Sequence, residues 1–486
     1  MKNKLYERML SYGILLFVGF LLIYRFAEGT TPLRPDAYVW DSGIFQTVGK
    51  LWAEGMVPYQ EVFDHKGPLL FFIQRIAYAF SEPKLALYCI ESLVMGLNLC
   101  LIHCIFSLRY RNLSSLLLSL VTALFWIPAL EYGNLTEEYS MPFILLALYF
   151  QLLYIKSEKI EHPVSYAFLY GLAFGCLSLI RINNGALLLV GVGVIGLQLL
   201  TVGKWKNILY NVLAFVIGIV SVYLPFLLYF HYHQAVGDML YATFVFNFLY
   251  AGEMTSVPSV AMLKGILHLI TPALLCIGAG VLSLCNKKII SALFLLVGAV
   301  GTLYVTLSGN SYAHYFMLMV PLIPLAFVLW PTCACKGYQA IGYAMCVVFV
   351  AFTLYTTGKI IPQKYITNQP TINAQNKERK ESWQSLVAQI PQHERNQVAA
   401  YGIGSNDTTL FITNDIQPMG KYIMLMQWHA KADATIATEY YQMLQEGTAK
   451  WVVAKEEQDL SALTHAYERV DFITDNEGTK SLWKRK

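Results

Sequence analysis

Long apolar runs separated by short polar loops dominate the first 358 residues of the chain. A bilayer core needs about 20 apolar residues per helix, and eleven runs approach that length. They predict membrane helices over residues 10–26, 85–108, 113–130, 138–155, 164–180, 184–201, 207–230, 259–284, 289–307, 315–331 and 338–357. The run from Pro68 to Phe80 is too short to span, so we expect a re-entrant or interfacial helix there.

The pattern changes after the last apolar run. Residues 360–376 are rich in Pro, Gln, Asn and Thr, which is typical of a linker. Beyond them, helical spacing alternates with short apolar runs that resemble buried strands, over 377–390, 397–402, 435–445, 451–454 and 470–474. We therefore expect a membrane domain over 1–358, a linker over 359–379 and a small soluble α/β domain over 380–486.

Composition and charge support this division. Only 14% of the residues are charged, against roughly 25% in soluble domains, and the mean hydropathy is +0.47. Residues 359–486 hold 15 basic and 15 acidic residues, which leaves 20 and 16 for the first 358. These values exclude a disordered protein and a nucleic-acid binder, and they argue against a soluble enzyme. The last of nine cysteines is Cys346, so no disulfide framework is expected outside the membrane.

The basic residues predict how the chain is oriented. Lys and Arg collect on the cytoplasmic side of membrane proteins. With the N-terminus inside, alternate loops hold Arg109, Arg111, Lys156, Lys159, Lys204, Lys206, Lys287, Lys288 and Lys336. This places the loop 27–67 and the C-terminal domain on the outer face of a plasma (inner) membrane. The first loop departs from the rule, since it carries Arg34, Lys50 and Lys66, and we take its cations as candidates for function.

Polar groups also gather on the predicted outer face. The first loop contains Asp41, Asp64, His65 and Lys66, and later outer loops contain Glu137, Glu138, Arg181 and His314. No Asp or Glu lies deep in a predicted span except Glu91, which is near an outer helix end. A transporter usually places ionisable groups near the bilayer midplane in spite of their insertion cost. The pattern therefore favours a reaction at the interface over translocation.

The first loop resembles a known family. Asp41, the turn at Gly55 and the run Asp64-His65-Lys66-Gly67-Pro68 are similar to the first outer loop of GT-C glycosyltransferases. The nearest group contains protein O-mannosyltransferases and the aminoarabinose transferase of lipid A. The resemblance extends to Thr136-Glu137-Glu138, to the position of Arg181 and to His314-Tyr315. It departs at Ser42, where many members have Glu, and at Gly67, where they have the first Pro of Lys-Pro-Pro.

The resemblance implies an α-helical polytopic fold and a reaction. Such enzymes move a sugar from a polyprenyl-phosphate carrier to an acceptor hydroxyl on a lipid, a glycan or a protein at the outer membrane face. It implies that Asp41 is the general base, with inversion at the anomeric carbon, and that Lys66 and Arg181 bind the donor phosphate. Asp64, His65, Glu137, Glu138 and His314 complete the expected site, although Glu137 and Glu138 also suit a plain capping role before a helix.

Two questions remain open from the sequence. Lys264 and His268 are four residues apart, so they could form one helical stripe that faces the donor phosphate, or Lys264 could simply extend to the interface. The second question is whether a divalent metal ion takes part. Some family members use one and others do not, and the acidic residues and histidines here lack a diagnostic metal spacing.

Two other functions compete with the transferase. The number of spans also permits a transporter or flippase of a lipid-linked sugar. A non-catalytic scaffold that binds envelope partners through its tail is the third alternative.

Overall fold

The computed structural model describes residues 2–157, 159–253, 268–308, 312–331, 336–362, 366, 369–424, 427–456 and 460–486. The chain divides into two compact units, and neither is continuous in sequence. The helical unit comprises Met1–Ala27, Tyr88–Phe226 and Ser256–Ile366. The mixed unit comprises Glu28–Leu87, Leu227–Thr255 and Thr367–Lys486.

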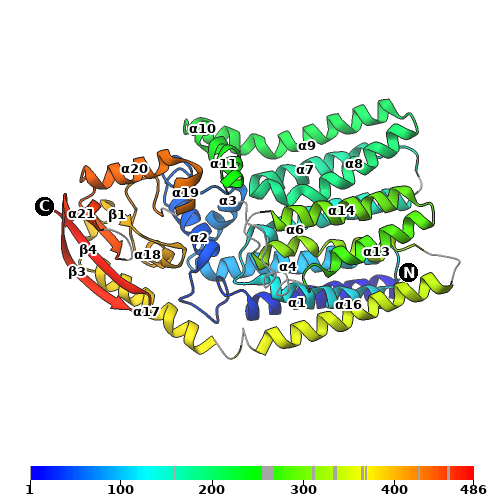
Figure 1. Cartoon of the computed structure of the whole chain (residues 1–486), viewed down its shortest axis with the longest axis horizontal. Helices are drawn as coiled ribbons and strands as arrows, with labels where there is room; N and C mark the ends of the chain where they lie inside the picture. Colours follow the sequence, from blue (N-terminus) through cyan, green and yellow to red (C-terminus); the bar gives the residue numbers. More distant parts are fainter. Residues whose placement is uncertain are drawn as a thin grey trace. The chain divides into compact units, whose positions relative to one another are not determined.

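Long apolar helices supply most of the helical unit (Figure 1). Their bounds are α1 Lys2–Phe26, α4 Pro83–Phe106, α5 Asn112–Leu130, α6 Thr136–Lys156, α7 Val164–Arg181, α8 Ala186–Thr201, α9 Trp205–Tyr232, α13 Thr271–Cys285, α14 Ile289–Leu307, α15 Leu322–Leu329 and α16 Lys336–Pro362. In the described part of the chain, eight helical stretches are long and apolar enough to cross a membrane, with Val164–Thr201 counted as one. The described helices overlap the predicted apolar runs, and residues 259–267 of the run 259–284 lie outside the described residues. The multi-pass helical fold is confirmed.

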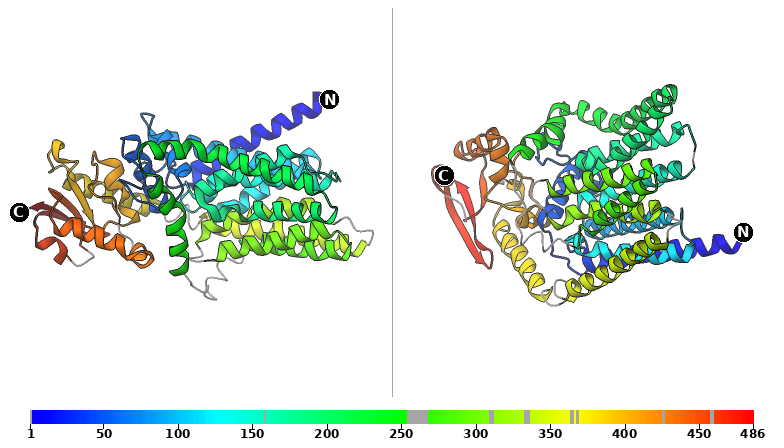
Figure 2. Two further views of the ribbon diagram at one scale, coloured as in Figure 1. Left: turned by 90° about the horizontal axis from the view of Figure 1, so that it is seen from above. Right: turned by 45° about the vertical axis from the view of Figure 1, so that its right-hand side comes forward.

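The stretch Val164–Thr201 contains a reversal. Arg181 has an extended backbone, with φ −161° and ψ 109°, and the 3₁₀ turn η1 (Ile182–Gly185) follows it. The predicted runs 164–180 and 184–201 therefore form the separate helices α7 and α8 (Figures 1 and 2). Helix α7 packs against α6, and α8 packs against α14. The apolar helices Thr271–Cys285 and Ala313–Leu329, the latter formed by η3 (Ala313–Met319) and α15, are shorter than a full span.

Close approach of backbones holds the helical unit together where side chains are smallest. A Cβ on Gly171 of α7 would lie 2.0 Å from the Phe215 carbonyl oxygen of α9. A Cβ on Gly218 of α9 would lie 2.4 Å from the Phe168 carbonyl oxygen of α7. Lipid chains are as apolar as the helices, so small residues that let backbones meet favour helix association in membranes.

The mixed unit contains a small sheet beside short helices. Its strands are β1 Val398–Tyr401, β2 Trp451–Lys455, β3 Tyr467–Asp475 and β4 Gly478–Arg485, in the spatial order β1-β2-β4-β3. β1 and β2 are parallel, with Val398 opposite Trp451, and β4 is antiparallel to both of its neighbours. Three strands match the predicted runs and β4 was not predicted. The small α/β region near the C-terminus is confirmed.

Helices and loops make up the rest of the described mixed unit. The helices are α2 Trp40–Ala53, α3 Pro68–Ala77, α10 Val236–Leu240, the π-helical η2 Tyr241–Val245, α11 Phe246–Glu253, α17 Gln369–Val387, η5 Gln392–Glu394, η6 Ser405–Thr408, α18 Thr409–Thr413, α19 Gln427–Ala432, α20 Ala434–Gln445 and α21 Ser461–Thr464. The ten-residue α3 is the short helix expected after Lys66, and it begins with Pro68, whose missing N–H costs nothing at that position.

Candidate functional site

Four of the predicted site residues lie in the mixed unit, and we call Asp41, Asp64, His65 and Lys66 the first-loop cluster. Asp41 belongs to the first turn of α2, and the other three precede α3. Asp64 and His65 are buried, whereas Asp41 and Lys66 are partly exposed. The Asp64 Oδ1 atom accepts the Lys66 backbone N–H at 2.9 Å, so the acidic side chain closes a tight turn at the entrance to α3.

Further hydrogen bonds fix the backbone of this turn. The Tyr59 hydroxyl donates to the Lys66 carbonyl at 2.8 Å, and the Asn247 amide donates to the His65 carbonyl at 2.7 Å. The backbone N–H of Phe63 donates to the Lys421 carbonyl at 2.8 Å. Because three separate segments bind the turn, the directions of the His65 and Lys66 side chains are set by the fold of the whole mixed unit.

The contact between Lys66 and His65 determines how the imidazole is protonated. The Lys66 Nζ atom lies 2.6 Å from His65 Nε2. An ammonium group only donates, so Nε2 accepts and the imidazole of His65 is neutral in this contact. The contact takes up one N–H of the ammonium group without neutralising its charge.

Two charged residues near Asp64 affect the pKa of its carboxyl group. Burial raises the pKa of Asp64, the charge of Lys66 opposes that effect, and the charge of Asp41 reinforces it. Lys66 and Asp41 therefore both lie within electrostatic reach of one buried side chain. Residues that are 25 positions apart in the sequence form one cluster.

Asp41 differs from the rest of the cluster. Within the described residues its carboxylate makes no hydrogen bond and no ion pair. It lies at the N-terminus of α2, where the backbone N–H groups favour a negative charge. A partly exposed, unpaired carboxylate in this position can accept a proton from a bound molecule.

His429 of α19 also lies beside the first-loop cluster, although it is not among the predicted site residues. Its ring centroid lies 6.3 Å from that of His65 and 5.8 Å from those of Phe63 and Phe246. Burial, reinforced by the charge of Lys66, lowers the pKa of His429 to about 3, so this imidazole is neutral near pH 7. No local pattern signals the contact, because the fold alone brings residue 429 to residue 65.

A second group of predicted residues lies in the helical unit. The Arg181 guanidinium donates to Glu137 Oε1 at 2.6 Å, and the Thr136 hydroxyl donates to Glu137 Oε2 at 2.8 Å. The guanidinium carbon also lies 4.2 Å above the ring of Tyr315. Glu137 is completely buried, and both of its carboxylate oxygens are bonded. This arrangement is an ion pair that joins α6 to the end of α7.

The neighbouring acidic residues of the helical unit bind backbone groups. The Glu138 Oε2 atom accepts the Leu135 N–H at 3.0 Å, which closes the first turn of α6. Glu91 accepts the Asn134 N–H at 2.8 Å through its Oε1 atom. Of the two roles open to Glu138, the structure shows the capping one.

His314 and Lys264 are the remaining predicted site residues. His314 is buried, and its Nδ1 atom lies 2.6 Å from Glu131 Oε2. Lys264, predicted to face the donor phosphate, lies outside the described residues. Across the ranges that the structure describes, no group of three or more His, Cys, Asp or Glu side chains is arranged to hold a metal ion, and we derive no step through a metal.

Comparison with known proteins adds the fold family. No protein-family model matches the sequence, and neither does any curated protein. Among solved structures, apo ArnT from Cupriavidus metallidurans matches with a TM-score of 0.58 and 11% identity, over 98% of this chain and 97% of that chain. The chain has a GT-C-like fold.

A second structure of the same GT-C-like protein gives the same result. ArnT bound to undecaprenyl phosphate has a TM-score of 0.57 and 11% identity, over 98% of this chain and 97% of that chain. An oligosaccharyltransferase from Archaeoglobus fulgidus has a TM-score of 0.49 and 12% identity, over 98% of this chain and 74% of that chain. The two ArnT structures confirm the GT-C-like fold expected from the first loop.

Proposed function

We propose that the protein is a membrane glycosyltransferase that moves a sugar from a polyprenyl-phosphate carrier to the hydroxyl group of a lipid, glycan or protein acceptor. The GT-C-like fold supports this, as does the binding of undecaprenyl phosphate by ArnT, whose fold is similar. The observation that carries the proposal is the first-loop cluster, where Asp41 and Lys66 both act on the buried carboxyl of Asp64.

Asp41 is the general base in this proposal. An acceptor hydroxyl is a weak nucleophile and must lose its proton as its oxygen attacks the anomeric carbon. The proton passes to the Asp41 carboxylate, the new carbon–oxygen bond forms, and the bond from the anomeric carbon to the phosphate oxygen breaks. One displacement of this kind inverts the anomeric centre.

Lys66 stabilises the leaving group. The polyprenyl phosphate departs with the bonding electron pair, and a fixed cation lowers the free energy of the charge that develops on its oxygen. The neutral imidazole of His65 orients the Lys66 ammonium group and leaves its charge in place. Asp64 is a positioning residue, because its carboxylate closes the turn that presents Lys66.

We assign the predicted residues of the helical unit roles outside the chemical step. The ion pair with Glu137 occupies Arg181, so we assign the donor phosphate first to Lys66. We assign Glu137 and Glu138 to holding the start of α6. The excess of Lys and Arg in alternate loops, which is typical of cytoplasmic loops, supports an outer-face location for the reaction and for the C-terminal region.

Transfer by the purified protein tests the proposal. Proteoliposomes receive the polyprenyl-phosphate-sugar fraction of the producing cells together with an extract of envelope lipids and glycans. A transferase releases free polyprenyl phosphate and labels an acceptor, and Asp41→Asn abolishes both. A flippase instead exchanges intact lipid-linked sugar across the bilayer, and counterflow without bond breakage would overturn the proposal.

A further inference from the structure

The backbone that leads into Asp41 is held in an uncommon conformation. Trp40, directly before Asp41, has a φ of +49° and is 51% exposed. A bulky residue rarely adopts this left-handed conformation, and it persists only where the surroundings impose it. The direction of the Asp41 carboxylate therefore depends on whatever fixes the turn through residues 38–41.

Part of that constraint comes from the far end of the chain. Thr408 of η6 is fully buried, and its hydroxyl donates to the Tyr38 carbonyl at 3.1 Å. The same hydroxyl lies 3.4 Å from the Ser405 carbonyl of its own turn. It also lies against Gly43 in the first turns of α2, where a Cβ would come within 2.1 Å of the Thr408 Oγ1 atom. Thr408 thus touches the chain on both sides of Trp40 and Asp41.

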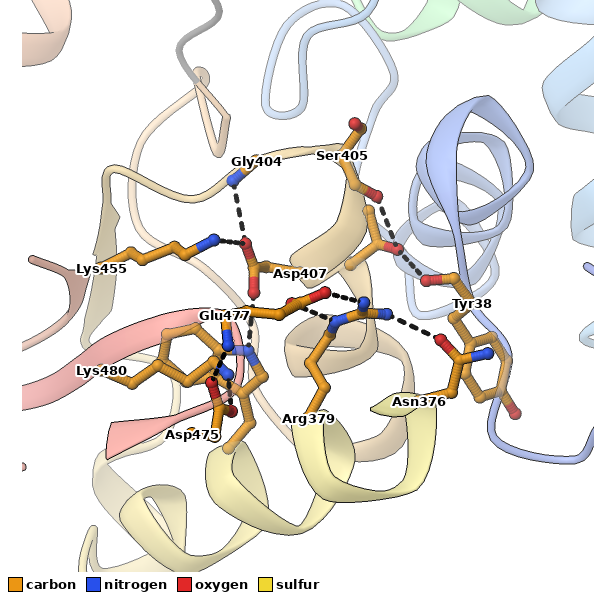
Figure 3. Close-up of polar contacts among 12 residues, drawn as sticks. Tyr38, Asn376, Arg379, Gly404, Ser405, Asp407, Lys455, Asp475, Glu477 and Lys480 are labelled. Atoms are coloured by element: carbon orange, nitrogen blue, oxygen red, sulfur yellow. Dashed lines mark hydrogen bonds and ion pairs between the residues drawn. The ribbon is translucent and has the colours of Figure 1, made fainter. Parts of the chain in front are cut away.

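A polar network holds Thr408 in its turn. The neighbouring Asp407 is buried and accepts the Trp383 indole N–H at 3.2 Å and the Gly404 N–H at 3.4 Å. The Lys455 ammonium group lies 3.7 Å from the Asp407 carboxylate, as Figure 3 shows. Beside it, Arg379 of α17 forms two hydrogen bonds with Glu477 of the β3–β4 turn. Trp383 of α17 and Lys455 of β2 thus hold η6 through Asp407.

The carbonyl groups before Tyr38 are fixed as well. The Lys84 ammonium group donates to the carbonyls of Arg34 at 2.5 Å and Ala37 at 2.7 Å. The Gly43 N–H donates to the Val39 carbonyl at 3.0 Å. Of the two side chains that hold carbonyls on the approach to Asp41, Lys84 and Thr408, Thr408 lies nearer to Asp41 along the chain.

We propose that Thr408 is a positioning residue that aims the Asp41 carboxylate, so that the C-terminal region of the chain completes the transfer site. This inference rests on the proposed function, because it assumes that Asp41 is the base. A general base must lie within hydrogen-bond reach of the proton that it removes. A displacement of about 1 Å at a reacting group can lower a rate by roughly 100-fold.

Two conservative variants of Thr408 test the proposal in the full-length protein. Thr408→Val keeps the shape of the side chain and removes the donor, and we expect kcat to fall at least about tenfold, with the donor KM within about twofold of wild type. Thr408→Ser keeps the hydroxyl, and we expect its kcat within about threefold of wild type. Thr413→Val is the matched control, because the Thr413 hydroxyl donates only within its own helix, to the Thr409 carbonyl at 2.8 Å.

Gly43 supplies a second, independent test. Gly43→Ala places a methyl group against the Thr408 hydroxyl, so kcat should fall as in Thr408→Val. Adding Thr408→Ala makes room for the methyl group, and the double variant should be more active than the product of the two single effects predicts. Simple multiplication of the two effects would contradict a direct contact at this point.

The outcomes separate this inference from the proposed function. If Thr408→Val keeps the wild-type kcat, or if Ser and Val lower it equally, Thr408 does not position Asp41. A fall in kcat that only follows the loss of folded protein, measured by thermal unfolding, has the same meaning. Asp41→Asn is assayed alongside, and full activity of that variant would instead refute Asp41 as the base.

Discussion

The predicted site residues of the two units differ in how their charges are paired. In the helical unit, the buried Glu137 binds Arg181 and Thr136 through its two oxygens. In the mixed unit, Lys66 contacts a neutral imidazole, and Asp41 makes no hydrogen bond or ion pair within the described residues. A buried charge must be paired to be tolerated, whereas a partly exposed charge can stay available to a substrate. We therefore expect Glu137 and Arg181 to stabilise the fold. We expect Asp41 and Lys66 to act in the reaction.

The largest effect expected from this contrast is on catalysis by Asp41. General-base catalysis contributes roughly 10²–10⁴-fold to a rate, so Asp41→Asn should lower kcat about 10³-fold while the unfolding temperature stays near the wild-type value. Transfer by the purified protein is measured with saturating donor. Asp36→Asn is the matched control, because Asp36 lies in the same loop and pairs with Lys380 at 2.6 Å. A similar loss of kcat in both variants would contradict a specific role of Asp41 as the base.

The opposite pattern is expected for Glu137. Glu137→Ala leaves the mostly buried guanidinium of Arg181 without its partner, which should cost about 3 kcal/mol of stability. The measurement is chemical unfolding in lipid nanodiscs. Arg181→Leu in the same protein should restore part of the loss, because it removes the unpaired charge. A stable Glu137→Ala protein that cannot bind donor would show that the pair belongs to the reaction.

Loss of the Lys66 charge should lower the transfer rate less than loss of the Asp41 carboxylate. A hydrogen bond to a charged group contributes about 1.5–3 kcal/mol, so Lys66→Gln should lower kcat/KM for the donor roughly 10- to 100-fold. Lys66→Arg keeps the charge and should recover part of that loss. Lys50→Gln is the control, since Lys50 pairs with Glu54 at 3.0 Å in the same loop. Equal donor kinetics for Lys66→Gln and the control would exclude the phosphate role.

The smallest expected effect is the pH dependence of stability contributed by His429. Its pKa is lowered from 6.5 to about 3 in the folded protein. Between these values the unfolded chain binds more protons, so stability falls as the pH falls through this window, with a slope of at most about 1.4 kcal/mol per pH unit. His429→Asn should remove that slope. Unfolding free energies measured from about pH 7 to about pH 5 would be parallel for the two proteins if His429 were not buried as described.

Local patterns in the sequence were sufficient for the helices and for part of the site. Apolar runs predict the long helices because a segment that crosses the bilayer core must be apolar. The Lys66-Gly67-Pro68 run predicts the start of α3. Strand β4 was missed because Lys480, Lys484 and Arg485 suggest a solvent-facing tail, although Lys480 is buried beside Asp475. The glycine at position 478, after the polar residues Asp475–Glu477, is the hairpin signal that could have found it, and the structure gives Gly478 a positive φ.

Contacts between distant segments could not be predicted. Thr408 and His429 reach Tyr38 and His65 only because the fold brings residues more than 300 positions apart together. The domain boundaries near residues 358 and 380, the side of the membrane on which the site lies and the roles of the site residues stay predictions.

Mass spectrometry of lipid-linked and surface glycans tests the central claim most directly. Cells without the protein are compared with cells that carry wild type or Asp41→Asn at equal membrane levels. The proposed transferase predicts that one sugar is absent from an acceptor in cells without the protein and in cells with Asp41→Asn. It also predicts that the polyprenyl-phosphate form of that sugar accumulates and that wild type restores the acceptor. Identical glycans in all three kinds of cell, or full restoration by Asp41→Asn, would contradict it.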